Sequence, residues 1–317
     1  NGTQVANTGE TWVDNVVLHV ADSLKALFHE GANVIAAHCH NTTGGAYADF
    51  GLFRNVRPDG VNAEVAEQKS VDVLATNTYY PFACGPVELD VVFTAPMLID
   101  DYDLISTPVN YISYQVRATD GQKHDVQVYL SGSPLLAVDQ ETQPTISTRG
   151  TQEGVTYVRT GTIDQPILAR KGDGICIDWG YFYMPAINGE VTLGNCVDVE
   201  LAFAENGTLP ATAPEIVARK PAEIPTLAYV HNFGQVETAS SYALVAYDEV
   251  QDIEYMYKRY KGYWAHEGQV SIFQAINNLN SNYASIMQRC RDFDKRIYDD
   301  GMAAGGKEYA EVLSANI

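Results

Sequence analysis

Acidic and aromatic side chains suited to chemistry occur together at Asp178-Trp179-Gly180-Tyr181, directly after the apolar run GICI. An acid, an indole and a phenol at the end of a strand would line a polar ligand groove, and Gly180 would allow the backbone to approach a ligand closely. The alternative is structural: the indole lies in a hydrophobic core and Asp178 pairs with a neighbouring cation. The sequence leaves both interpretations open.

A second group of carboxylates, Asp248, Glu249 and Glu254, stands with Tyr255 at the start of a segment whose pattern predicts a helix. One carboxylate would act as a general base that activates water. Hydrolysis of an amide would also need two hydrogen-bond donors for the oxyanion, and the sequence identifies no such pair. Acids in the first turn of a helix are favoured by the helix dipole, so a structural role is the preferred interpretation.

Aromatic residues follow in the run YKRYKGYW, as Tyr257, Tyr260, Tyr263 and Trp264. They would form one wall of a cleft or, as the preferred interpretation, pack between strands and helices. The expected ligand groove comprises Trp179, Tyr181, Tyr255 and Trp264, and the candidate catalytic residues are Asp178, Asp248, Glu249 and Glu254.

Histidine and cysteine are adjacent in NVIAAHCHNTTGG (33–45). Alternation along a strand places His38 and His40 on one face and Cys39 on the other. Two ligands make a weak metal site, and no third candidate is close in sequence. The stretch is therefore predicted to be the closing strand of a β domain, which turns at residues 41–45.

The acidic run IDDYD offers the hard oxygens that calcium prefers, through Asp100, Asp101 and Asp103. It lacks the spacing and the final glutamate of an EF-hand, so a solvated acidic turn is the preferred interpretation. The sequence has no GxSxG, Walker loop, dinucleotide fingerprint or HExxH motif. We therefore expect neither a metal nor a cofactor.

The chain carries 40 acidic and 20 basic residues, a formal net charge of -20. This balance argues against nucleic acid as a partner, because phosphate contacts need clustered lysine and arginine. No apolar run approaches the roughly 20 residues of a membrane-spanning helix. The five cysteines are scattered and odd in number, which disfavours a disulfide framework.

The first two thirds of the sequence predict β-structure. Runs rich in Val, Ile, Tyr and Thr alternate with turn residues at 87–96, 109–121, 124–132, 154–161 and 165–174. The run YISYQVRA alternates between two faces with the period of a half-buried strand, and the motifs TDG and KGDG predict hairpin turns. Many short strands at this spacing predict a mainly β fold, an antiparallel β-sandwich.

The pattern changes after a proline-rich stretch, 209–225, which predicts an extended connector, and a strand over 243–250. A short amphipathic helix is expected over 250–264 and a long helix over 270–298, ended by AAGG and followed by a last helix from Lys307. The long helix carries an apolar seam that cannot bury itself. We expect a partner helix to cover it, from the rest of its own chain or from a homodimer. The seam consists of Ile272, Ile276, Leu279, Tyr283, Ile286, Cys290, Phe293 and Ile297.

Five segments between about residues 66 and 312 resemble, in order, the glutaminase A family of fungal and Bacteroidetes proteins. They read QKSVDVLATNTYYPFACGPVELDVVFTAP, DDYDLISTPVNYISYQVRATDGQKHDVQVYLSG, TGTIDQPILARKGDGICIDWGYFYM, ALVAYDEVQDIEYMYKRYKGYW and CRDFDKRIYDDGMAAGGKEYA. The resemblance implies an amino-terminal β-sandwich over 56–235 and the first helices of a six-hairpin helical domain over 240–317. Residues 31–53 are similar to the closing strands of galactose-binding-like jelly rolls, which implies that residues 1–55 end such a module.

The family resemblance also implies hydrolysis of L-glutamine to L-glutamate and ammonia by an exported enzyme, periplasmic or extracellular. The chain begins with Asn1 and shows no signal peptide, so we expect that its amino end has been removed. Most of the helical domain is expected to lie beyond Ile317. The 317-residue chain should then supply mainly a non-catalytic sandwich and be inactive alone.

Two other functions fit the same pattern. A sandwich that leads into helices would also suit a glycoside hydrolase, which cleaves sugars with paired carboxylates. A non-catalytic module, for binding carbohydrate or as a scaffold, would explain the aromatic and acidic surface without a complete catalytic motif. The expected ligand is therefore a small amide or a carbohydrate.

Overall fold

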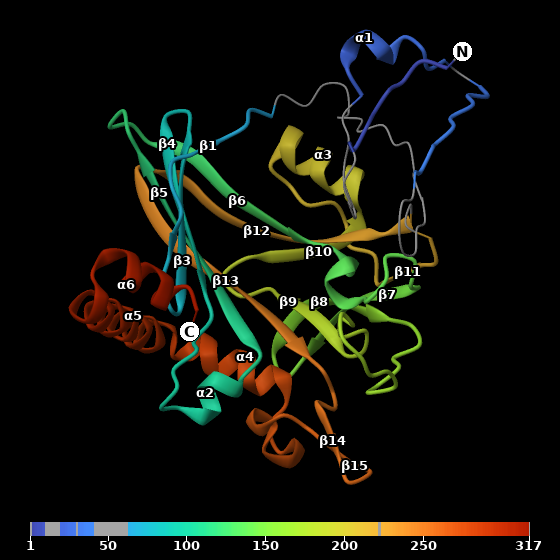
Figure 1. Cartoon of the computed structure of the whole chain (residues 1–317). Coiled ribbons are helices and arrows are strands. Elements are labelled where there is room, and N and C mark those ends of the chain that lie inside the picture. Colours follow the sequence, from blue (N-terminus) through green and yellow to red (C-terminus); the bar gives the residue numbers. More distant parts are fainter. Residues whose placement is uncertain (1, 10–19, 30, 41–62, 221–222, 317) are drawn as a thin grey trace. The chain divides into compact units, whose positions relative to one another are not determined.

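The computed structural model describes residues 2–9, 20–29, 31–40, 63–220 and 223–316 (Figure 1). The chain divides into two compact units, Asn1–Arg57 and Pro58–Ile317. Within the described residues, no helix combines the length and the apolar character needed to cross a membrane.

The first unit contains the short helix α1 (Asp22–Lys25). Residues 32–40, including His38 and His40, are exposed and pair with no strand in the part of the chain that the structure describes. No strand is assigned to these residues, so the predicted closing strand is not found among the described residues. The predicted turn at 41–45 lies outside the described residues.

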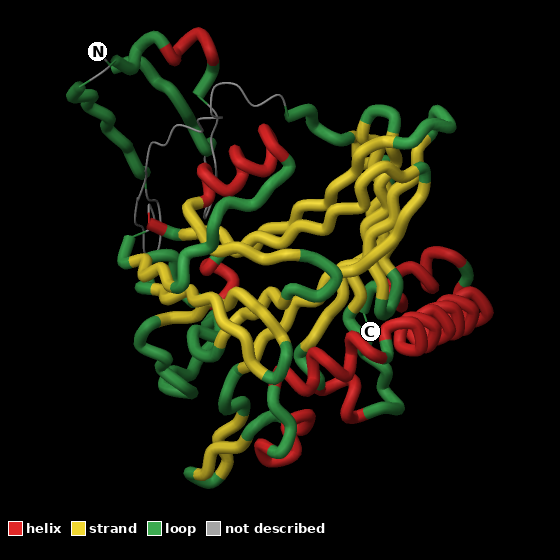
Figure 2. Tube along the Cα trace, turned by 180° about the vertical axis from the view of Figure 1, so that it is seen from behind, coloured by secondary structure: helices red, strands yellow, loops and turns green. Residues whose placement is uncertain are grey.

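Two antiparallel sheets form a sandwich in the second unit, which confirms the predicted mainly β fold (Figure 1, Figure 2). The larger sheet has the strand order β1-β3-β4-β5-β13-β9-β8-β7-β11, with β2 paired to β3, and the smaller sheet has the order β10-β12-β6. The larger sheet comprises β1 (Glu67–Gln68), β2 (Asp72–Val73), β3 (Asn77–Cys84), β4 (Val87–Thr94), β5 (Val109–Ala118), β7 (Thr145–Gln152), β8 (Val155–Thr162), β9 (Tyr181–Pro185), β11 (Glu215–Ala218) and β13 (Thr238–Asp248). The smaller sheet comprises β6 (His124–Gly132), β10 (Glu190–Asn195) and β12 (Pro225–Val236).

The helices lie mainly after the last sandwich strand, as the sequence predicts (Figure 1). They are α2 (Tyr102–Ser106), α3 (Cys196–Asn206), α4 (Ile272–Ser281), α5 (Tyr283–Gly305) and α6 (Lys307–Ser314), with short 3-10 segments η1 (Pro134–Ala137) and η3 (Tyr263–Gly268). The sequence pattern did not predict α3, which packs on the smaller sheet where Phe203 stacks on Tyr129 at 4.8 Å between ring centroids.

The two sheets enclose one hydrophobic layer. On β5, Tyr114 and Val116 point into this layer, whereas Tyr111 and Ser113 point to the opposite face. This alternation confirms the period-2 prediction for YISYQVRA. The layer consists of Tyr114, Val116, Val128, Val158, Met184, Val191, Leu193, Leu227, Tyr229 and Ala243.

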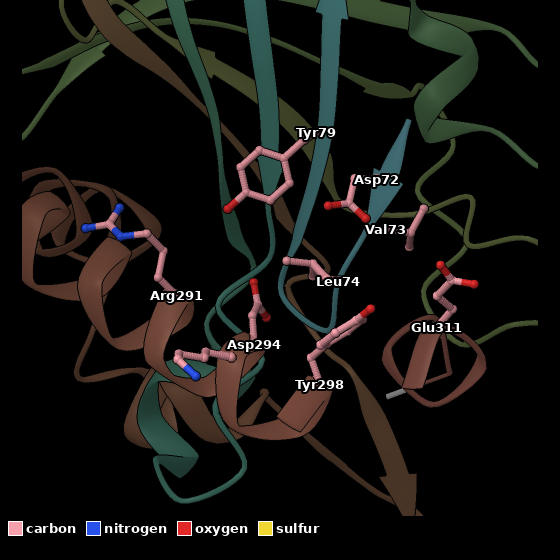
Figure 3. Close-up of a pocket in the computed structure, with 9 residues that line it drawn as sticks. Asp72, Val73, Leu74, Tyr79, Arg291, Asp294, Tyr298 and Glu311 are labelled. Carbon is pink, nitrogen blue, oxygen red and sulfur yellow. The ribbon is translucent and has the colours of Figure 1, made fainter. Parts of the chain in front are cut away.

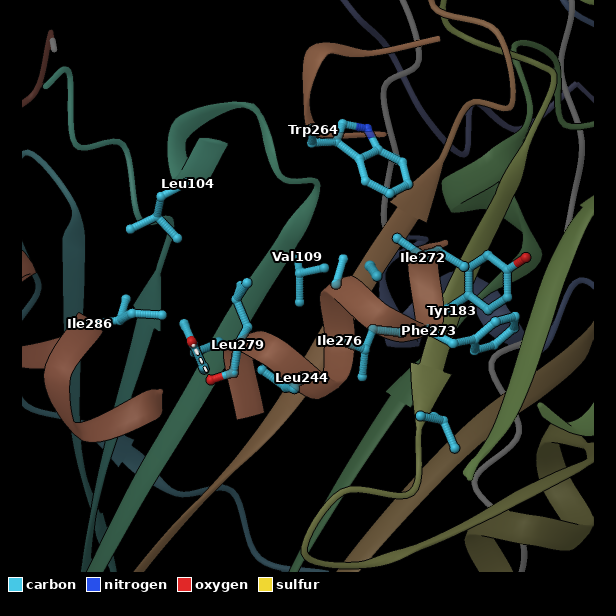
Figure 4. Packing of buried hydrophobic residues seen from close by; sticks show 14 of the residues in the cluster. Leu104, Val109, Tyr183, Leu244, Trp264, Ile272, Phe273, Ile276, Leu279 and Ile286 are labelled. Carbon is cyan, nitrogen blue, oxygen red and sulfur yellow. Dashed lines mark hydrogen bonds between the residues drawn. The ribbon is translucent and has the colours of Figure 1, made fainter. Parts of the chain in front are cut away.

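A second hydrophobic layer lies between the opposite face of the larger sheet and helices α4 and α5 (Figure 4). Ile276 and Leu279 of α4 belong to one buried cluster with Val109 and Leu244 of the sheet. The hydroxyl of Tyr111 donates a hydrogen bond to the carbonyl oxygen of Leu279 at 2.8 Å. Sandwich and helices therefore share a core.

The apolar seam of the carboxy-terminal helices is covered by this sheet. Six seam residues are buried there, and Tyr283 and Ile297 are partly buried against the same cluster. The ring of Tyr283 stacks on that of Tyr242 of β13, with 3.6 Å between centroids. The prediction that the seam needs a partner helix is therefore wrong, because the sandwich of the same chain provides the apolar surface.

The predicted helix over 270–298 is two helices that meet at Asn282. This residue leaves the helical conformation, with φ -103° and ψ 9°. Its side chain donates to the carbonyl oxygen of Asn278 at 2.9 Å, and asparagine side chains in such a run compete with backbone hydrogen bonds. The expected stop at AAGG is confirmed, since α5 ends at Gly305 and Gly306 has φ +79°.

Residues 250–264 form a hairpin and a 3-10 segment, so the predicted helix is wrong. Strands β14 (Ile253–Tyr255) and β15 (Lys258–Tyr260) are joined by Met256 and Tyr257, whose φ values are +50° and +64°. Two-residue turns with positive φ match the twist of paired strands. The aromatic and β-branched residues of this run also favour strands.

Three other local predictions fail. Residues 165–174, with their KGDG motif, form neither strand nor hairpin, because Gln165 and Leu168 take positive φ in the loop between β8 and β9. The TDG motif joins β5 to β6, which lie in different sheets, and therefore closes no hairpin. The connector 209–225 contains β11, which pairs with β7.

Candidate active site at the end of strand β13

Gly180 brings together two candidate segments that lie far apart in the sequence. Its φ is +80°, and a Cβ atom at this position would lie 2.2 Å from the carbonyl oxygen of Asp248 and 2.7 Å from Cα of Glu249. A residue without a side chain is required for this approach. The segment that holds Trp179 therefore runs beside the end of β13, where Tyr181 pairs with Asp248.

Asp178 is a buried carboxylate that is paired and hydrogen-bonded through Oδ2. Its side chain is 3% exposed, pairs with the guanidinium of Arg170, and accepts a hydrogen bond from Gln143 Nε2 at 2.8 Å. Arg170 also pairs with Asp139 at 2.9 Å. A general base must reach a proton of the substrate, so this environment favours the structural interpretation of Asp178.

Trp179 fixes the chain that follows β13. Its indole Nε1 donates to the carbonyl oxygen of Gln251 at 3.0 Å, and its own carbonyl oxygen accepts from the hydroxyl of Tyr247 at 2.8 Å. The side-chain Oε1 of Gln251 is buried and accepts no hydrogen bond from the described residues. Through these two hydrogen bonds, Trp179 connects the segment before β9 to the loop after β13, which carries Glu249 and Asp252.

Glu249 directly follows β13 and lies near two other acids, Asp248 and Asp252. Burial raises the pKa of this half-buried carboxyl to about 6, and the charges of Asp252 and Asp248 add to the rise. Burial and Asp248 likewise raise the pKa of Asp252, against the backbone N–H of Gly262 and the charge of Lys261. A carboxylate with a pKa near neutrality both accepts and returns a proton efficiently.

The turn that carries Glu249 is conformationally strained. Val250 has φ +66°, a region that β-branched residues rarely adopt. The backbone N–H of Val250 donates to Asp248 Oδ1 at 2.9 Å, which holds the turn in place. Strain of this kind is concentrated at functional sites.

An arginine packs against the tyrosines of β9, on the face of the larger sheet that Tyr181 shares with Asp248 by register. The guanidinium of Arg159 on β8 is 4.3 Å from the ring centroid of Tyr181, and its Nη1 donates to the hydroxyl of Tyr183 at 3.2 Å. Burial raises the pKa of Tyr183 to about 12, Arg159 opposes this rise, and the carboxylate of Asp248 adds to it. No carboxylate of the described residues lies within ion-pair distance of Arg159, whose guanidinium packs among the rings of Tyr157, Tyr181 and Tyr183.

The structure does not bring the remaining candidates into this cluster. Glu254 is exposed on the β14–β15 hairpin and pairs with Arg259 at 3.1 Å. Tyr255, on the same hairpin, is 63% exposed, whereas Trp264 is buried in the core. The preferred packing interpretation thus describes Trp264 but not Tyr257, which is 99% exposed.

The acids of IDDYD serve the local structure. Asp101 accepts a hydrogen bond from the backbone N–H of Leu104 at 3.0 Å, which caps α2, and pairs with Arg289 at 2.8 Å. Asp103 lies 3.0 Å from His266. Among the described residues, no three His, Cys, Asp or Glu side chains are placed to hold a metal ion.

Two members of the cluster were missed by sequence reasoning. Asp252 stands three residues after Glu249, and its proximity in sequence was a usable signal. Arg159 shares a face of β8 with Tyr157 by simple alternation, but no local pattern reveals which strands flank β8. The end of β13 thus holds a carboxyl with a raised pKa, Glu249, and Arg159 lies on β8, two strands away in the larger sheet.

Residues 76–300, well over half of the chain, match the family described as Domain of unknown function (DUF5127). The chain belongs to the DUF5127 family. It is also 25% identical over 272 residues to a protein named Glutaminase A from Aspergillus oryzae (strain ATCC 42149 / RIB 40). That similarity covers 81% of this chain, which spans 38% of the length of the Aspergillus protein.

The DUF5127 match includes the whole candidate cluster, from Arg159 through Gly180 to Asp252. The similarity to the Aspergillus protein agrees with the glutaminase A resemblance drawn from the sequence, at the level of distant relatedness.

Proposed function

We propose that this DUF5127 chain is part of a glutaminase-like hydrolase that converts L-glutamine, a small molecule, to L-glutamate and ammonia. The similarity to Glutaminase A over 81% of the chain carries the proposal. Because the chain spans 38% of that protein's length, we also propose that residues outside it contribute to the active site.

Glu249 is the proposed general base. It takes a proton from water, whose oxygen attacks the side-chain amide carbon of glutamine. The carbon–nitrogen bond then breaks, and the proton held by Glu249 passes to the leaving nitrogen to give ammonia. Arg159 is proposed to bind the α-carboxylate of the substrate, because its guanidinium lacks a carboxylate partner among the described residues and its donors suit that group.

Ammonia release from L-glutamine by the full-length protein tests both roles. Glu249→Gln should lower kcat by about 100-fold or more with little change in KM, because it removes proton transfer and not binding. Arg159→Gln should raise KM most. Glu254→Gln is the matched control, since its exposed carboxylate is paired on the hairpin, and should leave both constants unchanged.

Three results would contradict these proposals. Wild-type kcat in Glu249→Gln would exclude Glu249 as the base. Hydrolysis of glycosides and not of glutamine by the full-length protein would overturn the reaction itself. Rapid glutamine turnover by the 317-residue chain alone would contradict the need for residues outside it.

The domain organisation and the location of the protein are also proposed. We propose that residues 1–55 end a galactose-binding-like module and that residues 240–317 begin a six-hairpin helical domain. We further propose an exported protein, periplasmic or extracellular, on the basis of the family resemblance. Fractionation of the native cells tests the location, and recovery of the protein in the cytoplasm alone would contradict it.

A further inference from the structure

A cavity of about 330 Å³ lies away from the candidate active site, between the start of the larger sheet and helices α5 and α6 (Figure 3). Its walls come from β2, β3 and the residues between them, and from the two helices, none of which contributes to the cluster around Glu249. Its size falls in the range of sites for small molecules. It is lined by Asp72, Val73, Leu74, Tyr79, Arg291, Asp294, Lys295, Tyr298 and Glu311.

Charges of both signs line this cavity. Arg291 of α5 lies on one side of the cavity, and Asp72 of β2 and Glu311 of α6 lie on the other (Figure 3). Lys295 follows Arg291 by one turn of α5, and Asp294 lies between these two residues in the sequence of the same helix. Lys295 pairs with Asp299 and Glu311 lies 3.4 Å from Lys307, so both are partly neutralised. The guanidinium of Arg291 bonds only to Gln288 among the described residues, at 2.9 Å, and has no carboxylate partner there.

Asp294 is a buried carboxylate that hydrogen bonds hold in place. It is 2% exposed, yet no cation of the described residues lies within ion-pair distance. Its Oδ1 accepts from the backbone N–H and hydroxyl of Thr76 at 2.7 and 2.8 Å, and its Oδ2 accepts from Asn77 Nδ2 at 2.6 Å. These bonds fix the carboxylate, and a buried negative charge without a cation favours a cationic ligand group beside it.

Tyr79 lies near both the acidic and the basic residues of the cavity. Burial raises the pKa of its phenol, the charges of Asp294 and Asp72 add to the rise, and that of Arg291 opposes it. All three charged groups therefore lie close enough to act on one phenol. Tyr79 and Tyr298, with Val73 and Leu74, supply the apolar part of the lining.

We propose that this cavity binds a free α-amino acid, with the ammonium between Asp72 and Asp294 and the carboxylate on Arg291 and Lys295. Charges of both signs around one cavity match the two charges of a zwitterion, and a ligand with one charge would leave the opposite charge of the lining unsatisfied. The side chain of the amino acid would lie along the tyrosines. This binding site requires no catalysis and stands apart from the proposed hydrolysis.

Calorimetric titration of the chain with L-leucine, L-glutamine, N-acetyl-L-leucine and L-leucinamide tests the proposal. The two free amino acids should bind saturably, because their shared charges are recognised. The acetyl and amide derivatives of leucine, which each lack one charge, should bind at least tenfold more weakly. Saturable binding of neither amino acid at millimolar concentration, or equal binding of the derivatives, would overturn the proposal.

Substitutions test which residues bind the carboxylate and which bind the ammonium of the ligand. Arg291→Gln should weaken L-leucine at least tenfold and leave L-leucinamide unchanged, whereas Asp72→Asn should abolish the preference for L-leucine over its acetyl derivative. Arg296→Gln is the control: Arg296 lies on the same helix, 5.2 Å from the ring centroid of Phe293, and does not line the cavity. Equal weakening by Arg296→Gln and Arg291→Gln, with native circular dichroism in both, would also overturn the assignment.

Discussion

Replacement of Glu249 by glutamine should stabilise the protein at neutral pH, although it removes the proposed base. Burial and the neighbouring acids raise the pKa of Glu249 from 4.5 to about 6, so the folded chain resists ionisation of this carboxyl. A group whose pKa rises on folding supports the fold while it is protonated, and this support is lost as pH rises through the folded pKa. Because glutamine cannot ionise, the variant does not lose this part of the free energy of unfolding as the pH rises.

The size of the effect follows from the pKa change. At about 1.4 kcal/mol for each pKa unit, the change from 4.5 to about 6 corresponds to about 2 kcal/mol. Because Glu249 is only half-buried, solvent screening reduces this value, and we expect a gain of about 1 kcal/mol in the free energy of unfolding at pH 7.5. The gain should be absent at about pH 4, develop between about pH 4.5 and 6, and stay constant above about pH 7.

Urea unfolding of wild type and Glu249→Gln at pH 4.0 and pH 7.5, followed by circular dichroism, measures this difference. Glu254→Gln serves as the control, because the carboxylate of Glu254 is exposed and paired with Arg259. It should change the free energy of unfolding by less than about 0.5 kcal/mol at both pH values. A Glu249→Gln variant that is no more stable relative to wild type at pH 7.5 than at pH 4.0 would refute the reasoning.

Three further substitutions test the packing that positions the site. Gly180→Ala should destabilise the fold by at least about 2 kcal/mol in urea unfolding, because its Cβ would meet the carbonyl oxygen of Asp248 at 2.2 Å. Asp294→Ala should cost about 3 kcal/mol by the same measurement, because it leaves buried donors without an acceptor. Ile276→Ala should lower the free energy of unfolding by about 3 kcal/mol, whereas Val312→Ala, at a position 63% exposed, should change the melting temperature little.

Local patterns predicted the strands but not their partners. The alternation of YISYQVRA correctly places Tyr114 and Tyr111 on opposite faces of β5, because the two faces of a strand are fixed by its period. The same kind of pattern failed at residues 250–264. There, helical spacing of apolar residues competes with the strand preference of aromatic residues, and a two-residue turn at Met256 and Tyr257 decides the outcome.

The candidate site was predictable in its parts and not in its assembly. Glu249 and Trp179 were identified from residue type, but their proximity depends on Gly180, whose missing side chain admits the end of β13. The apolar seam of the long helix was identified correctly, but its packing partner was not. The periodicity of a helix does not reveal that a sheet of the same chain covers its apolar side. Contacts between distant segments are therefore what local sequence patterns could not predict.

The shared core links the stability of the helices to the geometry of the site. Phe273 of α4 lies 5.7 Å from Tyr183 and 5.0 Å from Tyr157, between ring centroids, and the Tyr183 hydroxyl accepts a hydrogen bond from Arg159. The position of the proposed carboxylate-binding cation thus depends on how α4 packs against the larger sheet. Loosening of α4 should release Arg159 before the sandwich layer itself opens, because that layer lies on the other face of the sheet.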